Sequence, residues 1–218
     1  MVERVIVTGT STEVGKTWVA AQLTEALRDE GLPVAARKPV QSYPEGSVTD
    51  AEVLGVASDE SPTSVCPAHR WYPLPIAPPM AAELLGHPPF ATEDLIEELH
   101  LPADRVCLIE GVGGPRSPVA DDGDTVTLAE MVDADLVILV AEPGLGTINS
   151  VLLAVAAFGD RPVVTLLNRY DAGEELHRRN RAWLQDVSGI DVVVDIAGLV
   201  ERITRPDQIV PDPEREEV

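Results

Sequence analysis

The fold of this chain is decided by the stretch GTSTEVGKT at residues 9–17, which has the form of a phosphate-binding loop. An apolar run at residues 5–7 precedes it and predicts a buried strand, and the helical spacing of residues 18–27 predicts a helix after it. In this strand, loop and helix context, backbone N–H groups at the start of the helix bind phosphate oxygens. We therefore expect a phosphate site at this loop.

The spacing of the loop differs from the usual form, because five residues separate Gly9 from Gly15 where four are usual. The alternative interpretation is a turn that happens to contain one lysine. Lysine is scarce in this chain, however, since Lys16 and Lys38 are the only two. The flanking strand and helix therefore favour a phosphate-binding loop over a chance match.

Further apolar runs alternate with helical patterns, at residues 34–36, 106–109, 136–140 and 163–167, with a possible sixth strand at 192–196. Their continuous apolarity indicates strands that are covered on both faces. We therefore expect an α/β, P-loop NTPase-like fold, with a mostly parallel sheet flanked by helices on both faces. In such a sheet the carboxyl ends of the strands share one edge, and ligands bind there.

We expect a single domain over residues 1–218, because the chain is long enough for one large core. The proline-rich segment 58–89 is expected to be an irregular excursion over the surface rather than a linker. The charged C-terminal tail, about residues 206–218, is expected to fray.

The composition excludes several classes of function. With 37 acidic and 16 basic residues the formal net charge is −21, which argues against binding to nucleic acid or to anionic membranes. No stretch is apolar over the length that a bilayer requires and no export signal opens the chain, so we expect a cytoplasmic protein. Cys66 and Cys107 show no zinc-ligand spacing and are expected to be buried thiols.

The second lysine, Lys38, follows the predicted strand at 34–36. In a parallel sheet this position lies at the same edge as Lys16, so two cations are expected to converge on one anion site. An ammonium is a compact point charge, unlike the forked guanidinium of arginine, which is the usual base in this chain. A surface lysine after a strand is the simpler alternative, but the shared edge favours a functional role.

Three side chains are candidate magnesium ligands: Thr17, Asp50 and Glu110. Mg²⁺ is usually held by one or two carboxylates together with phosphate oxygens and waters. Glu110 ends a predicted strand and is followed by a glycine-rich run that allows close backbone approach to a ligand. Asp50 could equally be an N-cap of a helix over residues 51–57.

A second anion site is predicted at residues 144–149, between the strand at 136–140 and a following helix. Free amides at the start of a helix suit an anion such as a substrate carboxylate. Alternatively, Thr147 simply caps that helix.

Together these motifs resemble the dethiobiotin synthase family. The family's Thr-Glu-Val-Gly-Lys-Thr, with the same five-residue gap, matches residues 12–17, and its Lys-Pro-Val followed by serine matches residues 38–42. Its Glu-Gly-x-Gly-Gly matches residues 110–114, and its Gly-x-Ile-Asn matches residues 146–149. The blocks occur in order from the N-terminus to Asn168.

The resemblance implies an ATP- and Mg²⁺-dependent ligase of biotin biosynthesis, a homodimer that carboxylates 7,8-diaminopelargonate with CO₂ and closes the ring to dethiobiotin. It implies catalytic roles for Lys16 and Lys38, and magnesium binding by Thr17, Asp50 and Glu110. The implied substrate-binding residues are Thr12, Ser42, Gly146, Thr147, Ile148 and Asn149. The implied ATP-binding residues, with Asn168 contacting adenine, are Thr12, Glu13, Val14, Gly15, Lys16, Thr17, Trp18, Asp50, Glu110, Gly111, Val112, Gly113, Asn168, Arg169, Ala197, Gly198 and Leu199.

Two other functions remain as alternatives. A partition-type regulatory ATPase would carry a signature lysine early in the loop, where this chain has Ser11. A related ATP-dependent amidotransferase would need a glutaminase domain, for which the chain has little room. The chain departs from the family pattern at Arg169 and at residues 196–199, which bears on the choice of nucleotide base.

Overall fold

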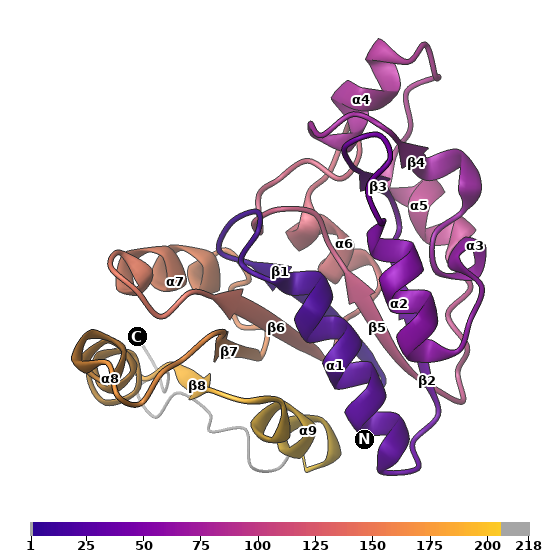
Figure 1. The fold of residues 1–218 in the computed structure, drawn as a ribbon. Helices are drawn as coiled ribbons and strands as arrows, with labels where there is room; N and C mark the ends of the chain where they lie inside the picture. Colours follow the sequence, from indigo (N-terminus) through magenta and orange to yellow (C-terminus); the bar gives the residue numbers. More distant parts are fainter. Residues whose placement is uncertain (1, 206–218) are drawn as a thin grey trace.

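The chain folds around a sheet of six parallel strands in the part that the structure, a computed structural model, describes, residues 2–205 (Figure 1). The strand order is β2-β5-β1-β6-β7-β8, and every neighbouring pair is parallel. The strands are β1 Arg4–Gly9, β2 Val34–Arg37, β5 Val106–Glu110, β6 Leu136–Ala141, β7 Val163–Leu167 and β8 Asp191–Val193. The predicted parallel sheet is confirmed.

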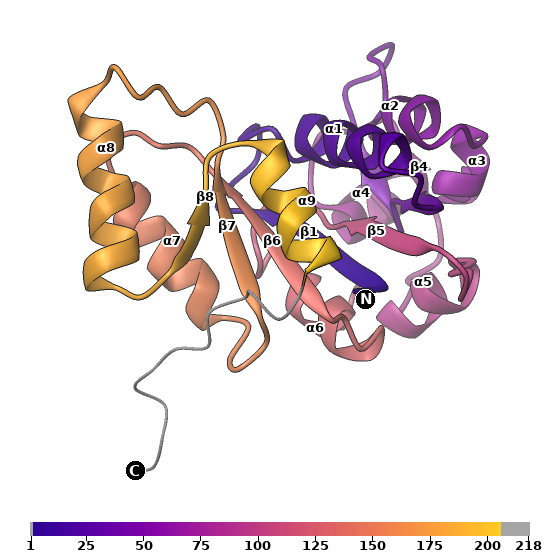
Figure 2. The ribbon, with the colours of Figure 1, turned by 90° about the horizontal axis from the view of Figure 1, so that it is seen from below.

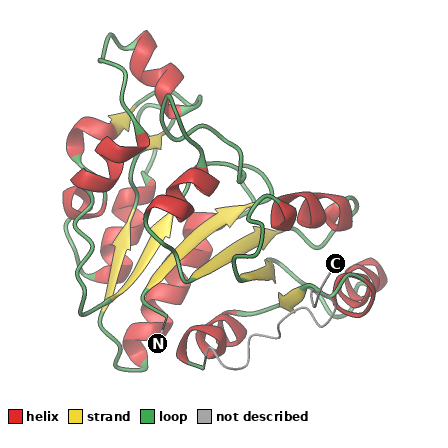
Figure 3. Cartoon of the chain, turned by 180° about the vertical axis from the view of Figure 1, so that it is seen from behind, coloured by secondary structure: helices red, strands yellow, loops and turns green. Residues whose placement is uncertain are grey.

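Helices cover both faces of this sheet, as the views from below and behind show (Figures 2 and 3). Val5 and Val7 point to one face and pack with α1, α2 and α9, whereas Ile6 points to the other face and packs with α5 and α6. Leu139 of β6 packs with α7 on the side of Ile6. Every residue of β6 is buried, which explains its continuous apolar sequence. The helices around this sheet are α1 Lys16–Asp29, α2 Asp50–Ser58, α5 Thr92–Glu98, α6 Thr125–Met131, α7 Thr147–Ala156, α8 Glu175–Ala182 and α9 Ile196–Thr204.

The sixth strand is shorter than predicted, because β8 ends at Val193 and α9 begins at Ile196. Asp195 is the N-cap of α9, and its Oδ1 accepts a hydrogen bond from the backbone N–H of Gly198 at 2.8 Å. A capping carboxylate satisfies a helix-start donor that has no partner within the helix. The apolar residues after Val193 therefore continue as a helix and not as a strand.

The segment 58–89 was expected to be irregular, but it contains short regular elements. These are α3 Pro62–Val65, the 3₁₀ turn η1 Ala68–Arg70, β4 Trp71–Tyr72 and α4 Pro78–Leu84. Strand β4 pairs in parallel with β3 Gln41–Ser42, and Tyr72 lies buried in a small apolar cluster. Elements this short carry no periodic signal in the sequence.

The position of β1 determines where a ligand can bind. The chain builds β2 and β5 on one side of β1 and β6, β7 and β8 on the other, so the strand order reverses at β1. Ligands of open α/β sheets bind beyond the carboxyl ends of the strands at such a reversal. The loop that follows β1 is the predicted phosphate-binding loop, which therefore lies at the expected place.

Both cysteines are buried, as predicted. Burial raises the pKa of the Cys66 thiol to about 12, so it stays protonated at neutral pH. None of the helices within residues 2–205 has the length and apolar character needed to cross a bilayer. The tail predicted to fray, about residues 206–218, lies outside the described residues.

Candidate active site

The loop between β1 and α1 has the backbone shape of an anion cradle. Glu13 (φ 61°) and Gly15 (φ 96°) adopt left-handed conformations. A Cβ atom at residue 15 would overlap the side-chain amide of Asn168, so only glycine fits there. Asn168, at the end of β7, donates from Nδ2 to the carbonyl of Val14 at 2.8 Å. The loop is thus held from the end of β7, two strands away in the sheet, and a loop of this left-handed shape is typical of backbone anion sites.

Lys16 begins α1 and lies almost buried beside this loop. Its Nζ donates to the carbonyl of Ser11 at 3.0 Å. Burial lowers the pKa of Lys16, and the nearby ammonium of Lys38 lowers it further. An anion bound in the loop would offset both effects, which favours phosphate binding at Lys16.

Lys38 forms the centre of a buried ion cluster one residue beyond β2. Its Nζ lies 2.8 Å from Asp50 Oδ2 and 2.7 Å from Glu110 Oε1, and it donates to the carbonyl of Gly111 at 2.9 Å. These three contacts use the three N–H groups of the ammonium. Burial disfavours the charged amine, but the two carboxylates outweigh burial and raise the pKa of Lys38 above its usual value. Lys38 is therefore a permanent cation at this edge of the sheet.

The hydroxyl of Thr17 connects the same two carboxylates. Its Oγ1 lies 2.8 Å from Asp50 Oδ1 and 2.9 Å from Glu110 Oε1. The structure thus brings together the three predicted magnesium ligands, from α1, α2 and the end of β5. Within residues 2–205 no cluster of three or more His, Cys, Asp or Glu side chains forms a separate metal site.

The start of α2 leaves the carboxylate of Asp50 free for this cluster. Thr49, not Asp50, is the N-cap: its Oγ1 accepts from the N–H of Glu52, and Glu52 accepts from the N–H of Thr49 in return. The alternative interpretation of Asp50 as an N-cap is therefore wrong. Gln41 Oε1 accepts from the N–H of Ala51 at 3.0 Å and fixes the same helix start.

The charges of the cluster suit a divalent cation. One ammonium, from Lys38, contacts two carboxylates, so the immediate group is one negative charge in excess. Burial raises the pKa of Glu110, and the neighbouring Asp50 raises it further although Lys38 opposes both. For Asp50, burial is outweighed by Lys38 and Thr17, and the pKa is lowered. Glu110 Oε2 is buried and has no hydrogen-bond partner among residues 2–205, which leaves a hard oxygen donor of the kind that Mg²⁺ binds.

A cavity of about 600 Å³ opens over the loop and the ion cluster, and it contains many of the predicted site residues. The predicted residues that line it are Thr12, Glu13, Gly15, Lys16, Thr17, Trp18, Lys38, Ser42, Asp50, Glu110, Val112 and Gly113. Two further predicted residues, Val14 and Gly111, lie beside it and act through their carbonyl oxygens.

Several residues of the cavity wall were not predicted from the sequence. The apolar part of the cavity wall is formed by Pro44 and by residues 75–77. Residues 75–77 belong to segment 58–89, which was expected to be an irregular excursion. Ser117 also lines the cavity, and its Oγ accepts from the N–H of Gly114 at 2.9 Å. In the sequence, only the proline content around residues 75–77 and the hydroxyl of Ser117 after the glycine run could have indicated these wall residues.

The predicted base-binding residues lie outside this cavity. Asn168 uses its amide to hold Val14 and to accept from the N–H of Arg169, whose guanidinium pairs with Glu142 at 2.7 Å. Residues 197–199 form the first turn of α9, where the side chain of Leu199 is fully buried.

Residues 146–149 also lie outside the cavity, at the start of α7. Gly146 (φ 90°) is the N-cap, and no side chain of the described part of the chain caps the helix. Thr147 is therefore not the cap that the alternative interpretation required, and its buried Oγ1 has no hydrogen-bond partner in that same part, residues 2–205. This helix start remains a candidate anion site.

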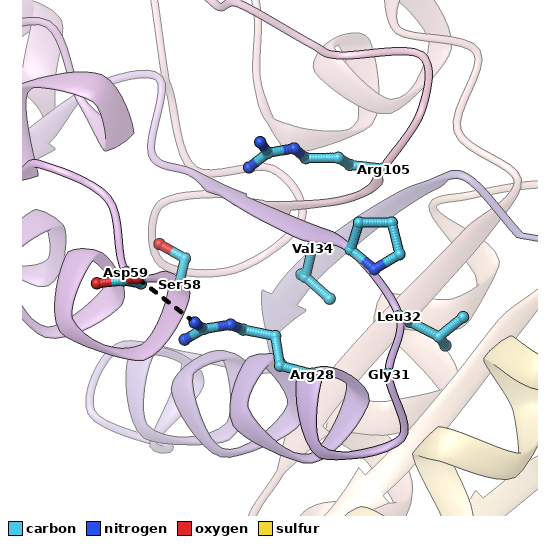
Figure 4. Close-up of a pocket in the computed structure, with 8 residues that line it drawn as sticks. Arg28, Gly31, Leu32, Val34, Ser58, Asp59 and Arg105 are labelled. Atoms are coloured by element: carbon cyan, nitrogen blue, oxygen red, sulfur yellow. Dashed lines mark ion pairs between the residues drawn. The ribbon is translucent and has the colours of Figure 1, made fainter.

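A second hollow, of about 460 Å³, lies at the opposite edge of the sheet (Figure 4). It is bounded by the end of α1, the start of β2 and the end of α2, and Arg28 and Arg105 reach toward it. The guanidinium of Arg28 donates to the carbonyl of Ala57 at 2.6 Å and lies 3.8 Å from Asp59. None of the predicted site residues lies here, so the cavity over the loop is the candidate active site.

Known proteins resemble this chain over most of its length. A family model described as an AAA domain matches residues 3–202. A protein named ATP-dependent dethiobiotin synthetase BioD from Rhodococcus jostii (strain RHA1) is 39% identical over 86% of this chain and 83% of its own length. Proteins of the same name from Aquifex aeolicus and Haloferax mediterranei are 32% and 35% identical, over 86% and 85% of this chain and 86% and 80% of their own.

Among solved structures, the signal recognition particle receptor FtsY from Elizabethkingia anophelis resembles this chain with a TM-score of 0.51. The match covers 94% of this chain and 66% of that one at 12% identity. Identity this low supports the shared P-loop fold alone.

Replacing Glu110 by Gln removes a charge from the proposed magnesium site and leaves the side-chain shape nearly unchanged. We expect nucleotide affinity in the presence of Mg²⁺ to fall at least about tenfold, because a carboxylate ligand is lost, while affinity in EDTA changes little. Titration calorimetry with a non-hydrolysable nucleotide measures both. Glu130→Gln on the exposed face of α6 is the matched control. Equal losses with and without Mg²⁺ would contradict the metal role.

Proposed function

The chain belongs to the ATP-dependent dethiobiotin synthetase family, and we propose on that premise that its cavity carboxylates 7,8-diaminopelargonate and closes the product ring at the expense of ATP. The observation that carries the proposal is the buried Lys38 beside the phosphate-binding loop, 2.7 Å from Glu110 and 2.8 Å from Asp50. It supports the proposal because a fixed cation at this edge would stabilise the charge of a phosphoryl group and of a carboxylated amine that react there.

In this reaction one amine of the substrate adds to CO₂ and forms a carbamate. A carbamate oxygen then attacks the γ-phosphorus of ATP, the bond to the β–γ bridging oxygen breaks, and ADP leaves. The second amine attacks the carbonyl carbon of the carbamoyl phosphate, inorganic phosphate leaves, and the ring closes. Each step moves charge onto oxygen atoms and none requires a nucleophile from the protein.

The residues of the cavity supply binding, orientation and electrostatic stabilisation. Lys16 and the loop amides hold the phosphates, and Lys38 stabilises the negative charge of the carbamate and of the transferring phosphoryl group. Thr17, Asp50 and Glu110 would hold Mg²⁺, which neutralises phosphate charge and orients the γ-phosphoryl group when bound. Ser42 and Thr12 line the cavity, where hydroxyl groups can hydrogen-bond the substrate amines.

This proposal is tested by phosphate release from ATP in the presence and absence of diaminopelargonate and bicarbonate. We expect release to depend on both compounds and on Mg²⁺, with dethiobiotin detected by mass spectrometry in equal amount. A rate of phosphate release that is the same with and without diaminopelargonate, as expected of a regulatory ATPase, would contradict the proposal.

Lys38→Arg keeps the charge but replaces a compact ammonium by a larger, planar group. We expect at least about a tenfold loss of kcat because the charge is displaced from the reacting oxygens. Arg116→Lys, at an exposed ion pair, is the control and should keep its activity. A Lys38→Arg variant that melts like wild type and turns over normally would show that Lys38 is not catalytic.

We propose that the nucleotide base is bound by Asn168, Arg169 and residues 197–199. Asn168 already uses one donor and its oxygen within the protein, and the Leu199 side chain is buried, so few groups remain to read the base. Strong discrimination requires buried groups that a wrong base leaves unpaired. We therefore expect CTP or GTP to compete within about tenfold of ATP, which is about 1.4 kcal/mol. A preference for ATP of a hundredfold or more would contradict this.

We also propose a cytoplasmic homodimer, formed through the face that carries the start of α7. Leu145, Leu152 and Leu153 expose their side chains there, beside the candidate carboxylate site at residues 146–149. Burial of such a patch is a main driving force for association. We expect wild-type protein to sediment as a dimer and Leu153→Glu as a monomer. Leu84→Glu, on the equally exposed end of α4, should stay dimeric, and a dimeric Leu153→Glu variant would exclude this face.

A further inference from the structure

Asn180, on α8, holds the turn that leads into α7. Its side chain is buried, and Nδ2 lies 2.9 Å from the carbonyl oxygen of Pro143 and 2.9 Å from that of Gly144. An amide NH₂ has two hydrogens, so it can donate one to each of these consecutive carbonyls. Figures 1 and 2 show α7 and α8 at the same end of the sheet.

The turn held by Asn180 determines where the N-terminus of α7 points. The carbonyl of Gly144 accepts from the N–H of Thr147 at 3.3 Å as well as from Asn180. Within residues 2–205 no side chain caps α7 and no acceptor is found for the N–H groups of Ile148 and Asn149, so these two donors remain available for a ligand. At the same helix start the Thr147 hydroxyl, with a residue exposure of 6%, has no hydrogen-bond partner within residues 2–205. Free N–H groups at an uncapped helix start suit an anion, and the buried, unpaired Thr147 hydroxyl offers one further donor at the same place.

We propose that Asn180 is a positioning residue for the substrate carboxylate, and that it acts by fixing the turn that presents the N-terminus of α7. This inference rests on the proposed function, because it takes diaminopelargonate as the source of the carboxylate. Asn180 itself does not contact the reacting atoms. An oxygen in place of its NH₂ group would face two carbonyl oxygens and push the turn away.

Asn180→Asp makes that replacement with almost no change in size. We expect the KM for diaminopelargonate to rise at least about tenfold, with kcat and the KM for ATP within about twofold of wild type. Asn180→Ser keeps one donor, adds no charge and should give a smaller rise, and it serves if the first variant does not fold. Gln185→Glu, five residues further along the chain, adds the same charge without touching the turn and should behave as wild type.

The methyl ester of diaminopelargonate separates a positioning role from a purely structural one. The ester lacks the negative charge, so wild type and Asn180→Asp should use it equally poorly. An unchanged KM for diaminopelargonate in both Asn180 variants would overturn the inference. So would a loss of activity from wild type to Asn180→Asp that is as large with the ester as with diaminopelargonate. A wild-type protein that does not turn over diaminopelargonate at all would instead overturn the proposed function.

Discussion

The structure depends on one buried ammonium that is shared by two carboxylates. Lys38 is 2% exposed and forms ion pairs with both Asp50 and Glu110, which come from the start of α2 and the end of β5. Removing the ammonium would leave the Glu110 carboxylate, which is 1% exposed, without its cation, at a cost of about 3–5 kcal/mol. The carboxyl end of β2, the end of β5 and the N-terminus of α2 must therefore meet at one point. The phosphate-binding loop joins them through the hydroxyl of Thr17.

Interactions farther from the cavity hold these elements in place. Next to Lys38, the guanidinium of Arg37 donates to Glu60 Oε1 at 2.9 Å and to the carbonyl of His100 at 2.6 Å, which fixes the end of β2. At the other side, Thr49 and Gln41 hold the start of α2. The cluster also gives the fold a pH dependence. The lowered pKa of Asp50 stabilises the fold above about pH 4, and this contribution is lost as the pH falls through the folded-state pKa.

The central site could be predicted from the sequence because its parts occupy fixed positions in a parallel sheet. Lys38 directly follows β2, Glu110 is the last residue of β5, and Lys16 lies after the loop that follows β1, so one edge must receive all three. The other residues of the cavity and of the α7 turn could not be predicted, because their positions depend on contacts between segments that are distant in the sequence. Residues 75–77 reach the cavity only because β4 pairs with β3, and Asn180 reaches its turn only because α8 returns to α7. Asp195 capping α9 was missed because β-branched residues before it continued the strand pattern.

The most direct test of the shared ammonium is a double-mutant cycle between Lys38→Met and Glu110→Gln, with the free energy of unfolding measured in urea at neutral pH. Lys38→Met leaves the buried Glu110 carboxylate without its cation, and Glu110→Gln removes the charge that Lys38 pairs with there, whereas the double variant removes both partners together. The account predicts that the double variant is more stable than the sum of the single effects by at least about 1 kcal/mol. Effects that add within about 0.3 kcal/mol would show that Lys38 and Glu110 are not coupled, and would contradict the account.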